Sequence, residues 1–304
     1  MVSDSDRPSV TGYPDRGDLM ADVTAIVGSA REAAWIVEHV ERTVASGTEG
    51  GFAAGALALA DRRAAGEPLQ YVLGTWQFRS LELSIDRRVL IPRPETEQVV
   101  ESALSELARM AKTRPDDDDP IVCVDLGTGS GAIALSLALE GPTTGKRVEV
   151  WATDRSPDAL DVARANLASL TRLDPDTERR VTLVAGSWYD ALPSLLERQV
   201  DLVVSNPPYV SEEDYGGLDP GVRDWEPIGA LVAARGRSGV AGMADVEEVV
   251  AGAIRWLRPG GALVVELSPT QAYGAIDAAR RAGFTRVETG RDLAGRVRML
   301  VAER

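Results

Sequence analysis

From residue 120 onward, short apolar runs alternate with helical stretches, and no other feature constrains the fold of this chain as strongly. Most of these runs are continuously apolar, which is typical of parallel strands covered by helices on both faces. Repeated strand–helix units of this kind predict an open, doubly wound α/β sheet, to which the end of the chain can add an antiparallel pair. The candidate strands lie at residues 121–126, 148–153, 181–185, 201–205, 262–267, 286–287 and 297–302, with helical stretches such as 157–170 and 244–257 between them.

The first third of the chain follows other periods. Residues 18–75 read as helices, with Ser29 and Glu32 in the pattern of a capping box and apolar residues at helical spacing behind it. Over residues 76–92 the apolar period changes to two, which predicts a β-hairpin linking two domains. We therefore expect a disordered leader over residues 1–17, a small helical domain over 18–75, the hairpin linker over 76–92 and a large α/β domain over 93–304.

Composition narrows the kinds of site that the chain can build. The one cysteine, Cys123, excludes an internal disulfide and a cysteine metal cluster, and the one histidine, His39, lies far before the motifs. A histidine base, a Ser–His–Asp triad and a histidine-ligated metal are therefore poorly supported, and we expect no metal site. The acidic run 116–119 reads as a solvated loop.

Charge and hydropathy bear on partners and compartment. No apolar run is long enough to span a membrane, and the polar start lacks the features of a secretory signal. We therefore expect a cytoplasmic protein without a membrane partner. The formal net charge of −14 argues against a nucleic-acid substrate, because nucleic-acid binders usually present a basic face to the phosphates.

A glycine-rich turn follows the first strand of the α/β region, at the sheet edge where ligands bind. It reads D-L-G-T-G-S-G over residues 125–131 and leads directly into a helix. Glycines at these places allow a tight turn and a close approach of the backbone to a ligand. The G-x-G-x-G spacing differs from the G-x-G-x-x-G dinucleotide fingerprint, which disfavours a dehydrogenase.

Three side chains near this turn are candidates for a nucleoside cofactor site. Asp154 ends the second strand, where its carboxylate can accept hydrogen bonds from both hydroxyls of a ribose. The alternative role for Asp154, the start of a helix, can be filled by Ser156. Asp125 is expected instead to order the glycine loop by accepting backbone N–H bonds. Trp188, after the third strand, offers a flat face to an adenine ring, with core packing as its alternative.

The fourth strand ends in a tetrapeptide that decides the predicted chemistry: Asn206, Pro207, Pro208 and Tyr209. The two prolines cannot donate to a β-ladder, so they end the strand and leave carbonyl oxygens facing the cleft. The Asn206 side-chain oxygen and the Pro207 carbonyl can accept the two hydrogens of a planar NH2 group, while Tyr209 packs on its flat face. The nitrogen lone pair can then point at a sulfonium methyl group, with orientation rather than a strong base lowering the barrier.

Together these segments resemble the peptide chain release factor glutamine methyltransferase family of the HemK/PrmC type. The resemblance covers nearly all of residues 29–304. Besides the glycine loop and N-P-P-Y, it rests on G-E-P-L-Q-Y-V-L-G at residues 66–74, V-L-I-P-R-P-E-T-E at 89–97 and E-P-I-G-A-L at 226–231. The R-P-E-T-E stretch is far more specific to this family than the glycine loop.

The resemblance implies a seven-stranded, Rossmann-like class I methyltransferase domain. It implies transfer of a methyl group from S-adenosylmethionine to N5 of the glutamine in the Gly-Gly-Gln motif of class 1 release factors, with S-adenosylhomocysteine as product. The helical domain would help to hold that protein substrate, and we expect a monomer. Cofactor contacts fall on Gly127, Thr128, Gly129, Ser130, Gly131, Asp154, Trp188 and Asn206, and substrate contacts on Asn206, Pro207, Pro208 and Tyr209.

Two departures from the family pattern border the expected cleft. The stretch 235–242 is longer than the family's usual connection, and the residues after Glu266 differ from those common in relatives. Two further functions stay open. An amino-methyltransferase acting on adenine or cytosine in DNA or RNA shares the N-P-P-Y logic, although the net charge argues against it. A non-catalytic regulator that binds S-adenosylmethionine is the other, although no member of the catalytic set is missing.

Overall fold

The structure is a computed structural model that describes residues 16–43, 49–114 and 119–304. The expected leader over residues 1–17 and the acidic run 116–119 therefore lie almost entirely outside the described residues. The described chain forms two compact units. One contains the residues up to Thr75 together with Asp219–Trp225, and the other contains Trp76–Leu218 and Glu226–Arg304. The chain thus leaves the second unit after Leu218 and returns to it at Glu226.

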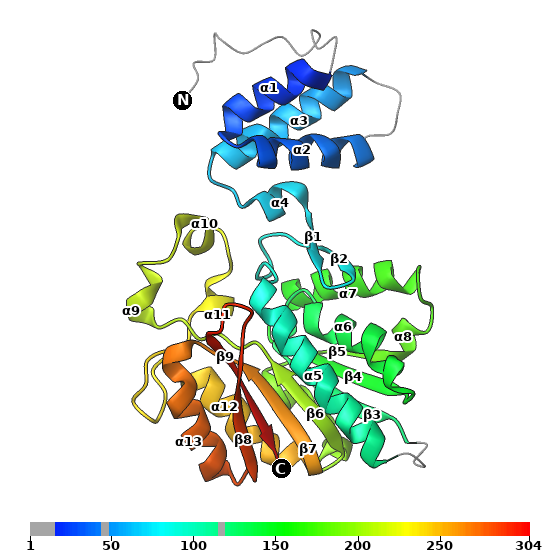
Figure 1. Ribbon diagram of the computed structural model, residues 1–304, viewed down its shortest axis with the longest axis vertical. Helices are drawn as coiled ribbons and strands as arrows, with labels where there is room; N and C mark the ends of the chain where they lie inside the picture. Colours follow the sequence, from blue (N-terminus) through cyan, green and yellow to red (C-terminus); the bar gives the residue numbers. More distant parts are fainter. Residues whose placement is uncertain (1–15, 44–48, 115–118) are drawn as a thin grey trace. The chain divides into compact units, whose positions relative to one another are not determined.

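The first unit is helical, as the periodicity of residues 18–75 predicts (Figure 1). Apolar side chains from its first three helices form its core, with Leu19, Val23 and Ile36 among the fully buried ones. Only the serine half of the capping box forms: Ser29 Oγ accepts the Glu32 N–H at 3.3 Å, while the Glu32 carboxylate pairs with an arginine of the third helix. The helices are α1 (Arg16–Val27), α2 (Ala30–Thr43), α3 (Glu49–Ala64) and α4 (Leu69–Leu73).

The second unit contains a seven-stranded sheet in the order β5-β4-β3-β6-β7-β9-β8. The five strands from β5 to β7 in this order are parallel, and β9 runs antiparallel to both of its neighbours. The predicted class I methyltransferase fold is therefore confirmed. The strands are β3 (Ile121–Leu126), β4 (Val148–Asp154), β5 (Val181–Ala185), β6 (Val200–Ser205), β7 (Leu257–Glu266), β8 (Arg286–Arg291) and β9 (Val297–Glu303).

Helices cover both faces of this sheet, which explains the continuously apolar strands. Every residue of β6 is buried. One face carries α5 (Pro94–Thr113), α6 (Ala132–Glu140) and α7 (Pro157–Thr171), and the other carries α12 (Ala244–Trp256) and α13 (Ala272–Ala282) (Figure 1). The strand order reverses direction between β3 and β6, and ligands bind at such a switch point, beyond the carboxyl ends of the strands.

Short elements complete the second unit. A two-stranded hairpin, β1 (Thr75–Phe78) and β2 (Leu81–Ser84), precedes α5. The remaining helical turns are η2 (Gly141–Thr144), α8 (Thr177–Arg180), η3 (Trp188–Ala191), η4 (Ser194–Leu196), α9 (Glu212–Tyr215), α11 (Ile228–Leu231) and η5 (Pro269–Gln271), while α10 (Pro220–Arg223) lies in the segment that belongs to the first unit.

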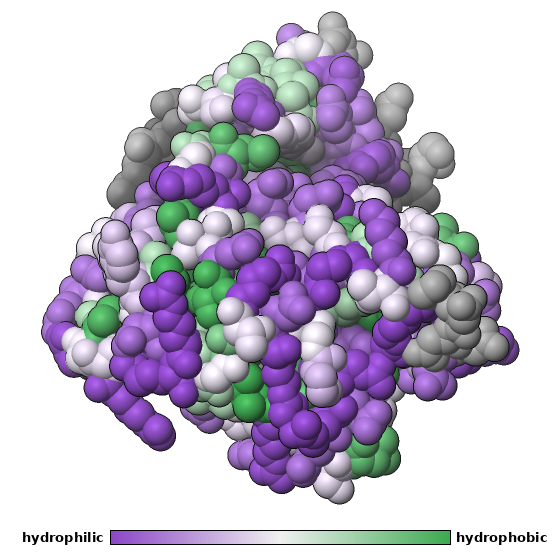
Figure 2. Space-filling view, turned by 60° about the horizontal axis from the view of Figure 1, so that its bottom comes forward, coloured by the Kyte–Doolittle hydropathy of each residue, from purple (hydrophilic) through white to green (hydrophobic). Residues whose placement is uncertain are grey.

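The surface is mainly polar. Figure 2 shows hydrophilic side chains over most of one face, with apolar residues in small groups between them. Scattered exposed apolar side chains are normal on a protein surface and carry no functional inference. Among the described helices, none has the length and apolar character needed to cross a membrane.

Asn166 of α7 ties the hairpin to the glycine loop. Its amide nitrogen donates to the carbonyls of Ser84 (3.0 Å) and Ser130 (2.8 Å), and its oxygen accepts the Ser84 N–H at 2.7 Å. Asn166→Ala leaves these backbone groups without partners, so we expect the free energy of unfolding to fall by about 2–3 kcal/mol, measured by urea denaturation. Arg164→Ala, on the exposed face of the same helix, is the control and should change it by less than about 0.5 kcal/mol. Equal effects of the two substitutions would refute the prediction.

Candidate functional site

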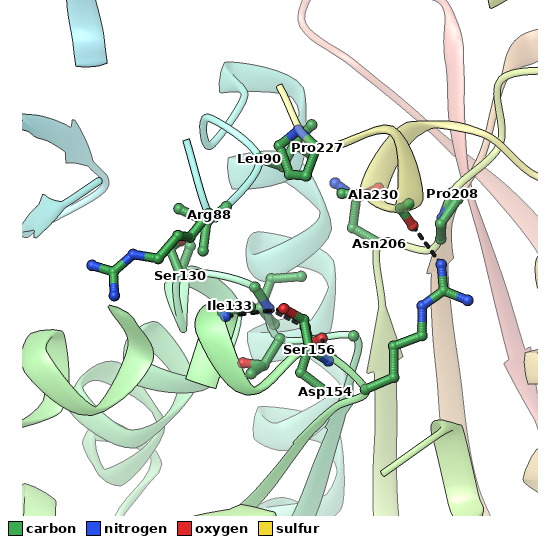
Figure 3. A pocket seen from close by; sticks show the side chains of 18 of the residues that line it. Arg88, Leu90, Ser130, Ile133, Asp154, Ser156, Asn206, Pro208, Pro227 and Ala230 are labelled. Atoms are coloured by element: carbon green, nitrogen blue, oxygen red, sulfur yellow. Dashed lines mark hydrogen bonds between the residues drawn. The ribbon is translucent and has the colours of Figure 1, made fainter. Parts of the chain in front are cut away.

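A cavity of about 250 Å³ lies in the second unit, at the carboxyl ends of β3, β4 and β6 (Figure 3). Segments far apart in the sequence line it, including residues 88–92, the glycine loop and residues 227–230. Gly131, Pro207 and Tyr209 are predicted site residues that do not line the cavity. The predicted residues that do are Gly127, Thr128, Gly129, Ser130, Asp154, Trp188, Asn206 and Pro208.

The glycine loop turns as its sequence predicts. Gly127, Gly129 and Gly131 have φ angles of +72°, +55° and +85°, which residues other than glycine rarely adopt. The N–H groups of Gly127 and Thr128 both donate to the Thr153 carbonyl, each at 2.9 Å. A Cβ atom built on Gly127 would lie 3.1 Å from the Trp188 ring. The loop backbone and this indole therefore approach each other closely enough to form one wall of the cavity.

Asp154 orders two neighbouring segments at once. Its Oδ2 accepts the Gly129 N–H and its Oδ1 accepts the Ser156 N–H, both at 2.9 Å (Figure 3). Each carboxylate oxygen keeps a second lone pair, so the group can still accept hydrogen bonds from a ligand. The helix-start role belongs to Ser156, because its hydroxyl caps α7 by accepting the Ala159 N–H at 3.2 Å.

Asp125 lies beneath the loop with no exposed surface. Its Oδ2 accepts the Thr128 hydroxyl at 2.6 Å and the Ala134 N–H at 3.1 Å, so it holds the loop to the start of α6. The N–H of Gly129, inside the loop, binds Asp154 instead, so the loop is ordered by two carboxylates rather than by Asp125 alone. Burial raises the pKa of the Asp125 carboxyl to about 7, and its Oδ1 has no partner among the described residues.

Trp188 belongs both to the core and to the cavity wall, because it packs against the buried core and also lines the cavity. Its φ of +44° is in the left-handed region, which is strained for a side chain of this size. The Thr153 hydroxyl donates to its carbonyl at 3.2 Å and helps to hold this conformation. Strained backbone of this kind clusters at binding sites, where the surrounding structure fixes it.

Asn206 connects to two residues that the sequence analysis did not single out. Its Nδ2 lies 3.2 Å from Thr96 Oγ1, and that hydroxyl lies 2.7 Å from Glu266 Oε2. The Tyr209 hydroxyl donates to Glu266 Oε1 at 3.2 Å. Burial raises the pKa values of both groups, to about 7 for the Glu266 carboxyl and above its ordinary value for the Tyr209 hydroxyl. The only sequence signal for Thr96 is its place in the R-P-E-T-E stretch.

The two stretches at 89–97 and 226–231 meet beside the cavity. Glu226 Oε2 accepts the Ile91 N–H at 3.0 Å, and the same carboxylate pairs with Arg93. Burial raises the pKa of the Glu226 carboxyl, and Arg93 opposes that shift. The ion pair thus joins two motifs whose paired residues are 133 positions apart, and residues of both motifs line the cavity.

The first departure from the family pattern contacts a residue just beyond the second. Gln271 ends η5, which follows β7, and its Nε2 donates to the carbonyls of Tyr209 (3.0 Å) and Gly242 (2.9 Å). Gly242 has a φ of +67°, and a Cβ there would collide with the Tyr209 carbonyl. Gly242 and Gln271 therefore pack against Tyr209 of the N-P-P-Y segment and do not line the cavity.

No cluster of residues able to hold a metal ion occurs within the part of the chain that the structure describes. The cavity instead offers a glycine cradle, a carboxylate and an indole face. This set of groups fits a nucleoside-containing ligand, because the carboxylate accepts hydroxyl hydrogens and the indole packs against a base.

Comparisons with known proteins agree with this geometry. A family model described as a methyltransferase domain matches residues 117–282. The N-terminal domain of human METTL16 in complex with SAH superposes with a TM-score of 0.51 at 16% identity, covering 96% of this chain and 95% of that one, which supports the fold alone. The release factor glutamine methyltransferase of Burkholderia pseudomallei is 44% identical over 239 residues, 78% of this chain and 76% of its own. That of Bordetella pertussis is 40% identical over 265 residues, 87% of each chain. The resemblance read from the motifs is thereby confirmed, and the chain belongs to the release factor glutamine methyltransferase family.

Proposed function

We propose that this protein transfers a methyl group from S-adenosylmethionine to N5 of the glutamine in the Gly-Gly-Gln motif of class 1 peptide chain release factors. The observation that carries the proposal is the position of Asn206, which lines the same cavity as the glycine loop and Asp154. An acceptor for an amide NH2 group thus faces the groups suited to the methyl donor. The relatives named for this reaction, at 40% and 44% identity, support the choice of substrate.

The residues of the cavity fit S-adenosylmethionine, which supplies the activated methyl group when bound. In this proposal Asp154 accepts the ribose hydroxyls and Trp188 packs against the adenine. The glycine loop would border the rest of the donor, and a side chain at Gly127 would push against the Trp188 ring that forms the same wall. The cofactor contacts are assigned to Gly127, Thr128, Gly129, Ser130, Gly131, Asp154, Trp188 and Asn206.

The chemical task of the site is to orient a poor nucleophile. An amide nitrogen shares its lone pair with the carbonyl, so loss of planarity must be favoured as the methyl group approaches. The Asn206 oxygen and the Pro207 carbonyl accept the two amide hydrogens, which stabilises the positive charge that develops on nitrogen as the N–CH3 bond forms and the S–CH3 bond breaks. One of these hydrogens then leaves the nitrogen as a proton and passes to water. Substrate contacts are assigned to Asn206, Pro207, Pro208 and Tyr209. Orientation of this kind supplies about 7–11 kcal/mol of barrier lowering.

The experiment incubates the protein with labelled S-adenosylmethionine and a purified bacterial class 1 release factor, and maps the label by mass spectrometry. We expect one added CH2 group on the Gly-Gly-Gln glutamine and no transfer to a factor in which that glutamine is alanine. Transfer to DNA or RNA in place of the factor would favour the amino-methyltransferase alternative. Binding of S-adenosylmethionine without transfer to either would favour the regulator.

We propose that the enzyme acts as a monomer in the cytoplasm, where translation takes place, and without a nucleic-acid partner. The net charge of −14 supports the last point. We further propose that the helical unit, expected over residues 18–75, serves to recognise the release factor, that residues 76–92 act as linker and that residues 93–304 carry the chemistry.

Asp154→Asn tests the cofactor assignment. The substitution replaces one carboxylate oxygen by an NH2 group. That group would face the N–H of Gly129 or of Ser156, donor against donor, and one acceptor for the ribose hydroxyls is lost. We expect the Kd for S-adenosylmethionine to rise about 10–100-fold by titration calorimetry, because hydrogen bonds to a charged group contribute about 1.5–3 kcal/mol each. Asp158→Asn, on the exposed first turn of α7, is the control. Equal Kd values for the two variants would remove Asp154 from the cofactor site.

A further inference from the structure

A buried hydrogen-bond network joins three segments that are far apart in the sequence. Thr96 lies in the first turn of α5, Asn206 follows β6, and Glu266 ends β7. Thr96 is 4% exposed and Glu266 is 1% exposed, so water does not compete for these groups. The distances are 3.2 Å from Asn206 Nδ2 to Thr96 Oγ1, and 2.7 Å from Thr96 Oγ1 to Glu266 Oε2.

The direction of each hydrogen bond in this network follows from the chemistry of the groups. An ionised carboxylate only accepts, so the Thr96 hydroxyl must donate its one proton to Glu266. The same hydroxyl then has only lone pairs left for Asn206. It therefore accepts from the Asn206 NH2 group, and the opposite orientation of the amide, with Oδ1 toward Thr96, would set two acceptors against each other. The network thus selects one of the two possible orientations of the Asn206 amide.

The selected orientation has a consequence for the reaction. Because the Asn206 nitrogen faces Thr96, its Oδ1 is left as an acceptor on a residue that lines the cavity. On the basis of the function proposed above, we propose that Thr96 and Glu266 are positioning residues that fix the Asn206 amide with its oxygen toward the substrate NH2 group. The threonine of R-P-E-T-E thereby gains a specific role in the transfer of the methyl group.

Glu266 also holds the other end of the tetrapeptide. It accepts the Tyr209 hydroxyl at 3.2 Å, so one carboxylate fixes the first and the last residue of N-P-P-Y. The charged groups facing it are Glu95 of α5, which raises its pKa, and Arg298 of β9, which lowers it. Arg93 and Arg298 act on Tyr209 in the same direction, lowering its pKa. Since burial raises the pKa of the Glu266 carboxyl to about 7, the network loses its acceptor charge as the pH falls below neutrality.

The test compares two substitutions of Thr96 in the full-length enzyme. Thr96→Val keeps the shape and removes the hydroxyl, while Thr96→Ser keeps the hydroxyl. We expect Thr96→Val to lower kcat about 10–100-fold, with KM for the release factor and Kd for S-adenosylmethionine within about threefold of wild type. Thr96→Ser should keep kcat within about threefold. Equal kcat for the valine variant and wild type, or equal losses for valine and serine, would overturn the proposal.

Glu266→Gln provides the second kinetic readout. In the wild type we expect kcat to decrease as the pH is lowered from about 8 to about 6, because the protonated Glu266 carboxyl can itself donate, and the Thr96 hydroxyl is then no longer forced to donate to it. The glutamine variant, which carries no charge at this position, should show a low kcat that does not vary over this range. A wild-type profile that stays flat, or a variant profile that keeps the wild-type slope, would contradict the role of Glu266.

A substrate-free measurement separates this proposal from the proposed function. The side-chain NH2 resonance of Asn206, identified by its loss in Asn206→Ala, should be the same in wild type and Thr96→Ser and should shift in Thr96→Val. A shift without any transfer to a release factor would refute the function and leave the network supported. An unshifted resonance in an enzyme that methylates the factor would refute the network alone.

Discussion

Replacing Asn206 with alanine is expected to lower kcat for methyl transfer by about 10²–10³-fold, because the variant loses the side-chain acceptor that orients the amide and stabilises its developing charge. The remaining acceptor, the Pro207 carbonyl, cannot fix the direction of the lone pair alone. Loss of orientation acts on the transition state more than on the bound substrate, so KM for the release factor should change little. Single-turnover rates with preformed enzyme–factor complex measure the chemical step directly.

Ser205→Ala is the matched control for this prediction. Ser205 precedes Asn206, is fully buried and donates its hydroxyl to the Leu126 carbonyl at 2.7 Å. Its removal disturbs the end of the same strand without touching the cavity, so the rate should stay within about threefold of wild type. If both substitutions lower the rate to the same extent, the loss at Asn206 reports damage to the strand end rather than the loss of an acceptor.

The positions of the strands along the chain were largely predictable because each strand has its own apolar run in the sequence. The runs at 121–126 and 181–185 match β3 and β5 residue for residue, since each is mainly apolar and is followed directly by a glycine. The start of β7 was predicted too late. Its first residues, L-R-P-G-G, carry the proline and glycines of a turn, yet Leu257 pairs with Val200 across a bulge. Local turn signals there are overridden by pairing with a buried neighbouring strand.

The predicted cofactor residues were largely brought together, because the glycine loop and Asp154 both end adjacent parallel strands. Their detailed roles were less predictable. The sequence gives no sign that Asp154 binds the Gly129 N–H, since that depends on how far the loop folds back over β4. Nor does it pair Thr96 with Glu266, which are 170 residues apart. Such pairs depend on which helix face packs on which strand end, and local periodicity does not determine that.

The grouping of residues 219–225 with the helical unit could not be predicted from local sequence patterns either. A prediction of consecutive domains assumes that the chain completes one before it starts the next. Here the segment after N-P-P-Y leaves the α/β unit and returns at Glu226, whose carboxylate is fixed by Arg93 and the Ile91 N–H. Where the chain returns, it is held by the ion pair between Arg93 and Glu226. The residues beside each partner in the sequence do not reveal that the two side chains pair.

Asp125→Asn is expected to change strongly how the free energy of unfolding depends on pH. Burial, the largest cause, raises the pKa of the Asp125 carboxyl from 3.8 to about 7, and the charge of Asp154 adds to it. Between these two pH values the folded protein binds a proton that the unfolded chain has released. The contribution of this carboxyl to the free energy of unfolding therefore falls as the pH rises through that window, by about 2–4 kcal/mol in total.

The asparagine variant lacks this titration, so its stability relative to wild type should increase by about 2–4 kcal/mol between about pH 4.5 and about pH 8.5, a range that spans most of the window. Urea unfolding at several pH values measures the difference, and subtracting the wild-type curve cancels the other titrating groups. Asp158→Asn, an exposed site, should show no such trend. A difference that is constant with pH would mean that Asp125 is ionised in the folded state throughout.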